Sequence, residues 1–172
     1  MIWKTWAPLR VKIFLWLAFR RRHWTADCRA RHGLDAREQC YLCDQATETI
    51  DHIIACCPYT REVWHHICQA LGRQLPPATP TIHTFWRRLR SLWTGQQQQG
   101  LDTFFALVSW TIWKEKNARC FQDAYTTVSQ LMPVIKAETD TWIQAGAHGL
   151  EYLATRAMLF SCHGCHLQDV AF

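Results

Sequence analysis

The chain has 172 residues, 49% of them apolar, and a net charge of +5. This composition excludes an intrinsically disordered polypeptide. Its longest apolar run, residues 11–19, is about half of the roughly 20 residues that a membrane span needs, so no membrane association is expected. Nine cysteines, an odd number, without a recognisable secretion signal indicate a reducing, intracellular setting rather than a disulfide framework.

The first predicted helix covers residues 9–22. Pro8 stands just before it, where the first turn tolerates a proline. Apolar residues then recur at helical spacing at Val11, Phe14, Leu15 and Ala18. Arg20–Arg22 lie at the C-terminal end of the pattern, where positive charge suits the helix dipole.

The N-terminal segment is strongly basic. Residues 1–37 carry nine of the nineteen basic residues but two of the fourteen acidic ones, a net charge of +7, whereas the remaining residues are net −2. Such a patch is expected of a protein with a polyanionic partner, and an ordinary solvated surface is the alternative. The candidate nucleic-acid contacts are Lys12, Arg20, Arg21, Arg22, Arg29 and Arg31 for phosphates, with Trp24 for stacking on unpaired bases.

Four bulky tryptophans in this segment argue against a mitochondrial transit peptide, which would be rich in serine. They are expected to pack largely in the core. These residues are Trp3, Trp6, Trp16 and Trp24.

A cluster of metal-ligand residue types follows. Cys40 and Cys43 have the spacing that lets both sulfurs of one turn face a single ion, and His52 comes nine residues after Cys43. Residues 48–57 are predicted to be a helix, which Pro58 ends. The fourth ligand is Cys56 or Cys57: a regular helix favours Cys56, four residues from His52, whereas Cys57 lies on the apolar face. Spacing leaves this choice open.

Three thiolates and one imidazole are a donor set that suits tetrahedral zinc. The protein would fill all four positions and leave none for a water molecule. The pattern therefore predicts one structural Zn²⁺ that stabilises a fold, and no catalytic metal.

The rest of the chain also reads as helical. Helices are predicted over residues 59–71, 82–94, 101–121 and 129–145. Residues 73–81 contain three prolines and read as a linker, and GQQQQG (95–100) reads as a polar break. Strand-like alternation is almost absent, so the predicted fold class is mostly α: a small zinc-organised helical domain followed by a helical tail.

A second short tract, CHGCH, lies near the C-terminus. Cys162, Cys165 and His166 match the spacing of c-type haem attachment, but the chain shows no export signal to reach that machinery. Of the two metal interpretations, a weak second zinc site is favoured over haem attachment. The interpretation favoured over both is that these residues are incidental and lie in an exposed tail.

The first 64 residues resemble the zinc-binding domain downstream of the reverse transcriptase in plant LINE-type (non-LTR) retrotransposons. The similarity is carried by Trp3-Lys4, Pro8, Phe14 and Trp16, by Thr25, Asp27 and RHG at 31–33, and then by Cys40, Cys43, Glu48-Thr49, Asp51-His52, Cys57-Pro58 and Val63-Trp64. The resemblance implies Cys57 as the last ligand. Residues 110–122 and 135–147 are similar to the tail of such elements. Cys28 and Arg29 depart from the pattern.

Composition and the resemblance together predict four segments: the zinc-binding domain (1–72), a linker (73–81), a helical tail (82–147) and an ambiguous extension (148–172). The resemblance implies a non-catalytic, zinc-binding, nucleic-acid-binding module. The alternative is a structural or protein-interaction module stapled by zinc. The expected partners are nucleic acid and other retroelement proteins. A nuclear location is expected, and a small-molecule substrate is not expected.

No polymerase sequence precedes the domain, and neither an Asp-Asp pair nor a carboxylate cluster for two-metal chemistry is present. The sequence therefore reads as a fragment or remnant of a retroelement polyprotein, without polymerase or nuclease activity of its own.

Overall fold

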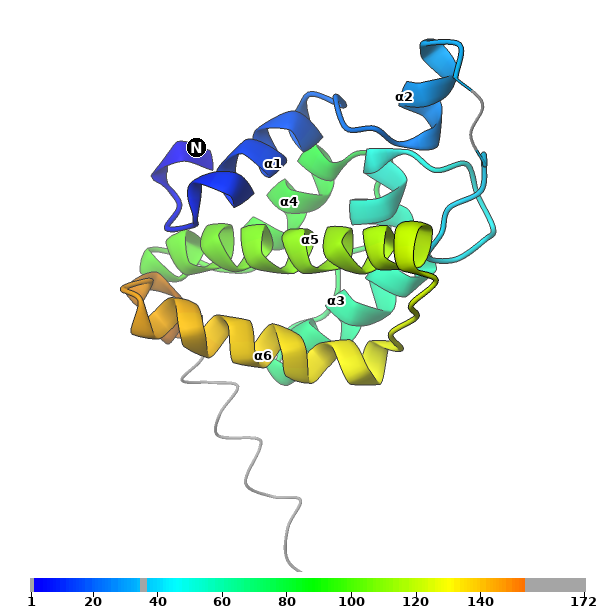
Figure 1. The fold of residues 1–172 in the computed structure, drawn as a ribbon. Helices are drawn as coiled ribbons and strands as arrows, with labels where there is room; N and C mark the ends of the chain where they lie inside the picture. Colours follow the sequence, from blue (N-terminus) through cyan, green and yellow to red (C-terminus); the bar gives the residue numbers. More distant parts are fainter. Residues whose placement is uncertain (1, 35–36, 154–172) are drawn as a thin grey trace, which may run out of the picture.

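The computed structural model describes residues 2–34 and 37–153, which form a helical bundle (Figure 1). Within this described part, extended pairing is limited to one antiparallel bridge between Gln39 and Thr47, so the predicted mostly α fold is confirmed. In chain order the elements are η1 (Ile2–Lys4), α1 (Leu9–Phe19), α2 (Ala26–Arg31), η2 (His52–Cys56), α3 (Pro58–Ala70), α4 (Ile82–Arg90), α5 (Gln96–Gln122), α6 (Val128–Gln144) and η3 (His148–Leu150).

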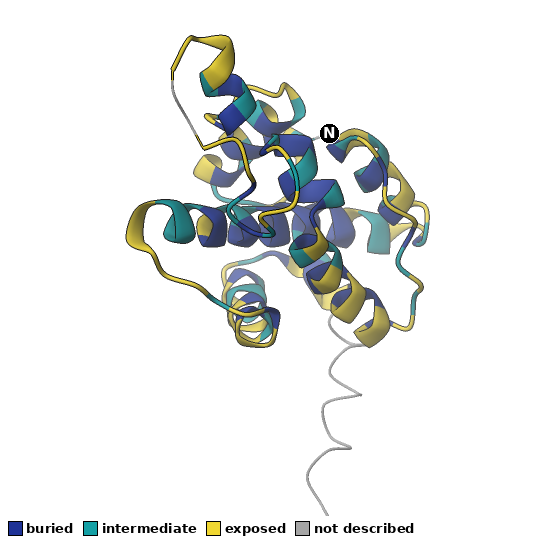
Figure 2. Ribbon diagram, turned by 90° about the vertical axis from the view of Figure 1, so that its right-hand side faces the viewer, coloured by how far each residue is buried: buried dark blue, intermediate teal, exposed yellow. Residues whose placement is uncertain are grey.

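Helix α5 runs through the middle of the molecule, between α1 and α6 (Figure 1). It contacts α1, α4, α6, η2 and η3, and most of its middle turns are buried (Figure 2). Its buried side chains Leu101, Phe105 and Ile112 share one hydrophobic core with Phe14 of α1 and Trp64 of α3. The tail therefore docks on the N-terminal unit. The division into a zinc domain, a linker and a tail stays a prediction about sequence units.

Helix α1 ends three residues earlier than predicted. The backbone N–H of Arg21 donates to the Ala18 carbonyl at 3.0 Å, and that of Arg22 donates to the Leu17 carbonyl at 3.0 Å. Arg21 has a φ of 53°, in the left-handed region. This is the Schellman pattern that closes a helix, here without glycine. The arginine run thus leaves the helix instead of continuing it.

Helix α5 begins earlier than predicted, because GQQQQG is not a break. Glutamine is a good helix former, and the helix starts at Gln96. Gly100 serves a packing role within it: a Cβ on this residue would lie 2.0 Å from the Gly149 carbonyl oxygen of the following segment. The predicted end of the last helix at residue 145 agrees with the end of α6 at Gln144.

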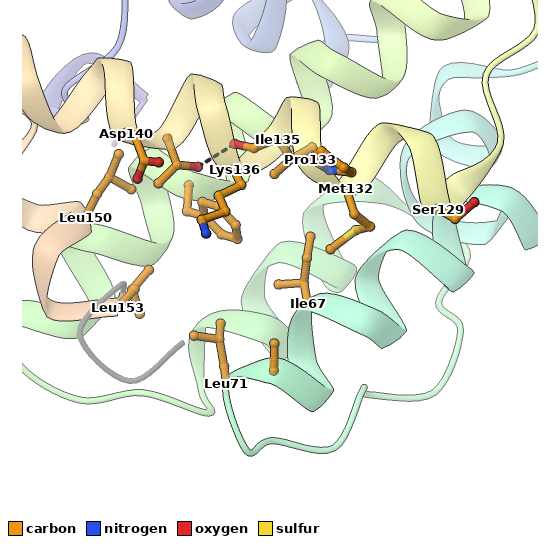
Figure 3. A pocket seen from close by; sticks show the side chains of 13 residues that line it. Ile67, Leu71, Ser129, Met132, Pro133, Ile135, Lys136, Asp140, Leu150 and Leu153 are labelled. Carbon is orange, nitrogen blue, oxygen red and sulfur yellow. Dashed lines mark hydrogen bonds between the residues drawn. The ribbon is translucent and has the colours of Figure 1, made fainter. Parts of the chain in front are cut away.

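A pocket of about 520 Å³ lies between α3, α6 and η3 (Figure 3). Its lining is mainly apolar, with Lys136 and Asp140 on one wall. No residue that the sequence predicted as a metal or nucleic-acid contact lines it.

None of the helices in the described ranges combines the length and the hydropathy that crossing a bilayer requires.

Candidate metal centre

The turn that holds Cys40 and Cys43 is fixed by its own backbone. The Cys40 N–H donates to the Ala46 carbonyl at 2.8 Å, and the Asp44 N–H donates to the Cys40 carbonyl at 2.8 Å. Asp44 adopts a left-handed φ of 59°, which folds the chain back after Cys43. The Leu42 N–H points at the Cys40 Sγ from 3.4 Å, a contact that favours the thiolate form. As predicted, both cysteines lie in a turn.

The segment from His52 to Cys56 is a π-helix with Cys57 as its C-cap, not the regular helix that periodicity predicted. The Cys57 N–H donates to the His52 carbonyl at 2.7 Å, five residues back. This wider turn brings residues five apart onto one face, whereas a regular helix aligns residues four apart. His52 and Cys57 are therefore brought together. Cys56 turns away, and its Sγ donates to the Thr79 carbonyl at 2.9 Å.

The ligand-type atoms of Cys40, Cys43, His52 and Cys57 all lie within 4.8 Å of one another. The Cys43 Sγ and the His52 Nε2 are 3.3 Å apart. A tetrahedral zinc ion with its usual bond lengths sets sulfur–nitrogen separations of about 3.6 Å, so the spacing fits with small adjustments. Cys40 and Cys57 are buried, and Cys43 and His52 are half-buried. The cluster fits one Zn²⁺, and all four positions come from protein side chains.

The three thiols change one another's pKa values. The hydrogen bond from Cys57 lowers the pKa of Cys40 to about 4, against the opposing effect of burial. The same contact, with burial, raises the pKa of Cys57, and burial raises the pKa of Cys43. Thiols must lose their protons to ligate a metal ion. Zinc would replace these protons and keep all three sulfurs as thiolates.

Buried charges attach this cluster to helix α5. The Lys116 Nζ lies 3.1 Å from the Glu48 Oε1, and their side chains are only 2% and 0% exposed. Burial raises the pKa of Glu48, while Lys116 acts in the opposite direction. Further along α5, the Arg119 Nη1 donates to the Leu42 carbonyl inside the cysteine turn at 3.0 Å. The tail helix therefore contacts the Leu42 backbone just before Cys43 and the Glu48 side chain after it.

Other metal-ligand types in the described part of the chain lie elsewhere. His65 and His66 are exposed on α3, and Cys68 is buried in the core. The CHGCH tract, with Cys162, Cys165 and His166, falls outside the described residues.

The predicted nucleic-acid contacts lie on and after α1. Arg20, Arg21, Arg22 and Arg31 are exposed, as is the stacking candidate Trp24, whereas Lys12 and Arg29 are half-buried. Two of them are engaged in ion pairs, Arg21 with Asp51 at 2.6 Å and Arg31 with Asp27 at 3.2 Å. Because Asp51 directly precedes His52, the pair places this basic surface beside the metal cluster.

The expected core packing of the four N-terminal tryptophans is wrong. Trp3, Trp6, Trp16 and Trp24 are all exposed. Trp6 is the most covered of them and packs its ring against Trp142 at 5.7 Å. Sequence reasoning missed Trp3 and Trp16 as possible contacts, although aromatic residues within a basic segment were a usable signal.

These features define a class of protein: an all-helical zinc-binding module with a closed, structural type of site and a basic face. The same class follows from comparison with known proteins. Residues 1–64 match the family described as zinc-binding in reverse transcriptase, a zinc-binding domain and not a catalytic one. The predicted resemblance to the zinc-binding domain of reverse transcriptases is thereby confirmed.

One curated relative is "Putative ribonuclease H protein At1g65750" from Arabidopsis thaliana, which is 27% identical over 120 residues. The match covers 70% of this chain and 19% of that protein, so the chain spans about a fifth of the relative. No solved structure gives a significant match.

Proposed function

We propose that the chain is a non-catalytic, zinc-dependent nucleic-acid-binding module derived from the reverse transcriptase polyprotein of a LINE-type retrotransposon. The zinc ligands in this proposal are Cys40, Cys43, His52 and Cys57. The family match over residues 1–64 and the relative named for ribonuclease H support a retroelement origin. In this proposal polymerase and nuclease chemistry belong to other parts of the parent polyprotein.

The observation that carries the proposal is the exposed arginine run at the end of α1. The Schellman turn directs Arg20–Arg22 off the helix, and Arg22 has no ion-pair partner within the described residues. Arg21 ties this turn to Asp51, next to the metal cluster. A phosphate backbone approaching the run would find positive charge on a turn held in place by the zinc segment.

The test is a salt titration of binding to nucleic acid by fluorescence anisotropy. Binding should weaken steeply as salt rises, because each phosphate contact releases condensed counterions. Replacing Arg20 and Arg22 with Gln should reduce both the affinity and the salt slope, with helicity and zinc content unchanged. Lys136→Gln, an exposed charge on α6, is the matched control. Affinity that stays flat between low and moderate salt contradicts the proposal.

The alternative function, a protein-interaction module stapled by zinc, is favoured by one observation. The apolar pocket between α3, α6 and η3 is large enough for several side chains of a partner (Figure 3). If the variant with Arg20 and Arg22 replaced keeps both its affinity for nucleic acid and its stability, the protein-interaction function replaces the nucleic-acid-binding function.

A further inference from the structure

A second pocket, of about 330 Å³, opens between η1, α1, α4 and α5. Its wall is mostly aromatic: Trp3 from η1, Trp16 and Phe19 from α1, and His83 and Trp86 from α4. None of these residues was predicted from the sequence as a functional contact. Aromatic rings on several sides of one opening are the feature that single-stranded nucleic-acid-binding proteins use to hold bases.

The inner wall of this pocket is built rigidly. The Phe19 ring meets His83 edge-on at 5.9 Å and Trp86 edge-on at 6.1 Å. The Trp86 Nε1 donates to the Asp102 Oδ1 at 3.0 Å, and the Arg90 Nε donates to the same carboxylate at 3.1 Å. Asp102 is thus neutralised by Arg90 and fixes the Trp86 ring, so it presents little uncompensated negative charge to a ligand.

The outer wall offers exposed aromatic rings. Trp3 is 55% exposed and Trp16 is 39% exposed. Among the described residues, neither ring packs against another aromatic ring. A planar ligand entering here could stack on an indole without displacing an existing ring contact.

Three cationic residues neighbour residues that line the pocket. The Arg20 guanidinium lies 5.2 Å from the Trp16 ring centroid. Arg87 is exposed and lies one helical turn beyond His83 on α4, and Lys4 directly follows Trp3. These three cations have no ion-pair partner within the described ranges. A base in the pocket would therefore leave its phosphate among unpaired cations.

We propose that this pocket receives an unpaired nucleobase of a single-stranded nucleic acid, a proposal that rests on the proposed nucleic-acid binding. Trp16 and Trp3 stack on the base, and Arg20 and Arg87 hold the flanking phosphates. A base inside a duplex is stacked on its neighbours and cannot enter. The pocket therefore makes the module selective for single strands, RNA or DNA, over duplexes.

The test compares the affinities of the full zinc-loaded chain for single-stranded RNA, single-stranded DNA and a duplex, each of about 12 nucleotides per strand. Trp16→Leu should weaken single-strand binding on the order of 5- to 100-fold, the range for losing one stacked base. Duplex binding should change less than about twofold, because it depends on the phosphate contacts that remain. Phe121→Leu, an aromatic side chain that is 75% exposed and outside the pocket, is the matched control and should bind like wild type.

Trp3→Leu provides a second variant, since Trp3 lies in a short exposed element and contributes little to the core. In the wild-type chain, a single strand carrying 5-iodouracil should cross-link on irradiation to Trp3 or Trp16, located by peptide mass spectrometry. A loss of single-strand affinity without a loss of duplex affinity in either variant supports the proposal, as does a cross-link at either residue. The support applies to RNA or to DNA, according to which of the two strands shows the effect. Unchanged single-strand affinity in both variants, with no cross-link in the pocket, overturns it while nucleic-acid binding stands. A wild-type chain that binds no nucleic acid at low salt overturns both.

Discussion

Cys56 and Cys57 are sequence neighbours with different surroundings, and the difference is one of helix geometry. The π-turn from His52 directs the buried Cys57 toward the cluster and Cys56 toward the Thr79 carbonyl. Spacing alone could not decide between them, because a period of 3.6 residues favours Cys56. The resemblance to a known pattern favoured Cys57, the residue that the structure places in the cluster.

Replacing these two cysteines one at a time tests that geometry. Cys57→Ser should lower zinc affinity on the order of 100-fold or more, because it removes a thiolate that contacts the ion. Cys56→Ser should leave the affinity within a fewfold of wild type. A competition titration against a chromogenic chelator measures both. Equal losses, or a larger loss for Cys56→Ser, would show that the cluster is assigned to the wrong cysteine.

His23 makes the stability of the fold depend on pH. Its ring packs between Phe14 and Trp113, at 4.8 and 4.7 Å, and its Nε2 lies 2.8 Å from the Phe14 carbonyl. Burial lowers the pKa of His23, and Lys116 lowers it further. The unfolded chain therefore takes up the proton more readily than the folded one. The stability that neutral His23 contributes is present above its unfolded pKa of about 6.5 and is lost as the pH falls below it.

His23→Gln should flatten this dependence, since glutamine can still donate to the Phe14 carbonyl and does not titrate. Urea unfolding of the zinc-loaded chain between about pH 7.5 and 5.5 measures the free energy of unfolding for both proteins. Wild type should lose more stability than the variant as pH falls. Parallel curves would mean that His23 titrates equally in the folded and unfolded states.

At the scale of elements, helix α5 is the main support of the metal segment. The buried pair of Lys116 and Glu48 joins α5 to the residues between the two halves of the cluster. Sequence periodicity located α5 and its apolar face but not this pair, because a lysine and a glutamate 68 positions apart carry no local signal. Helix α2 was missed for a related reason: its six residues are too few to show a period.

Lys116→Met should cost about 3–5 kcal/mol of unfolding free energy, because it leaves the Glu48 carboxylate buried without a partner. The double variant Glu48→Gln/Lys116→Met should be less destabilised than Lys116→Met alone, since no unpaired charge remains. Lys114→Met on the same helix, which loses an exposed pair with Glu138 at 3.0 Å, is the control and should cost about 1 kcal/mol or less. Chemical denaturation of the zinc-loaded proteins measures all three. If Lys116→Met costs no more unfolding free energy than Lys114→Met, the buried pair does not stabilise the contact between α5 and the metal segment.

At the scale of the whole molecule, the metal segment and the tail form one folded unit. Proline-rich residues 73–81 have the composition of a linker, yet Asp51 accepts a hydrogen bond from the Ile82 N–H at 2.8 Å directly after them. The shared core includes Ile53, Trp64, Phe85 and Phe105. The division into sequence segments rests on composition, which carries no information on which apolar faces meet, so the shared core could not be predicted from it. The helical class, the basic segment and three of the four clustered side chains could be read from local patterns, whereas the choice of Cys57 came from the family resemblance.

The most direct test of the account is the metal content of the purified chain by native mass spectrometry, with helicity followed by circular dichroism while a chelator removes the metal. The account predicts one zinc per chain and a loss of helicity on its removal that extends to α5, since that helix packs on the metal segment. A full-length chain that carries no zinc and keeps its helicity in chelator would contradict it.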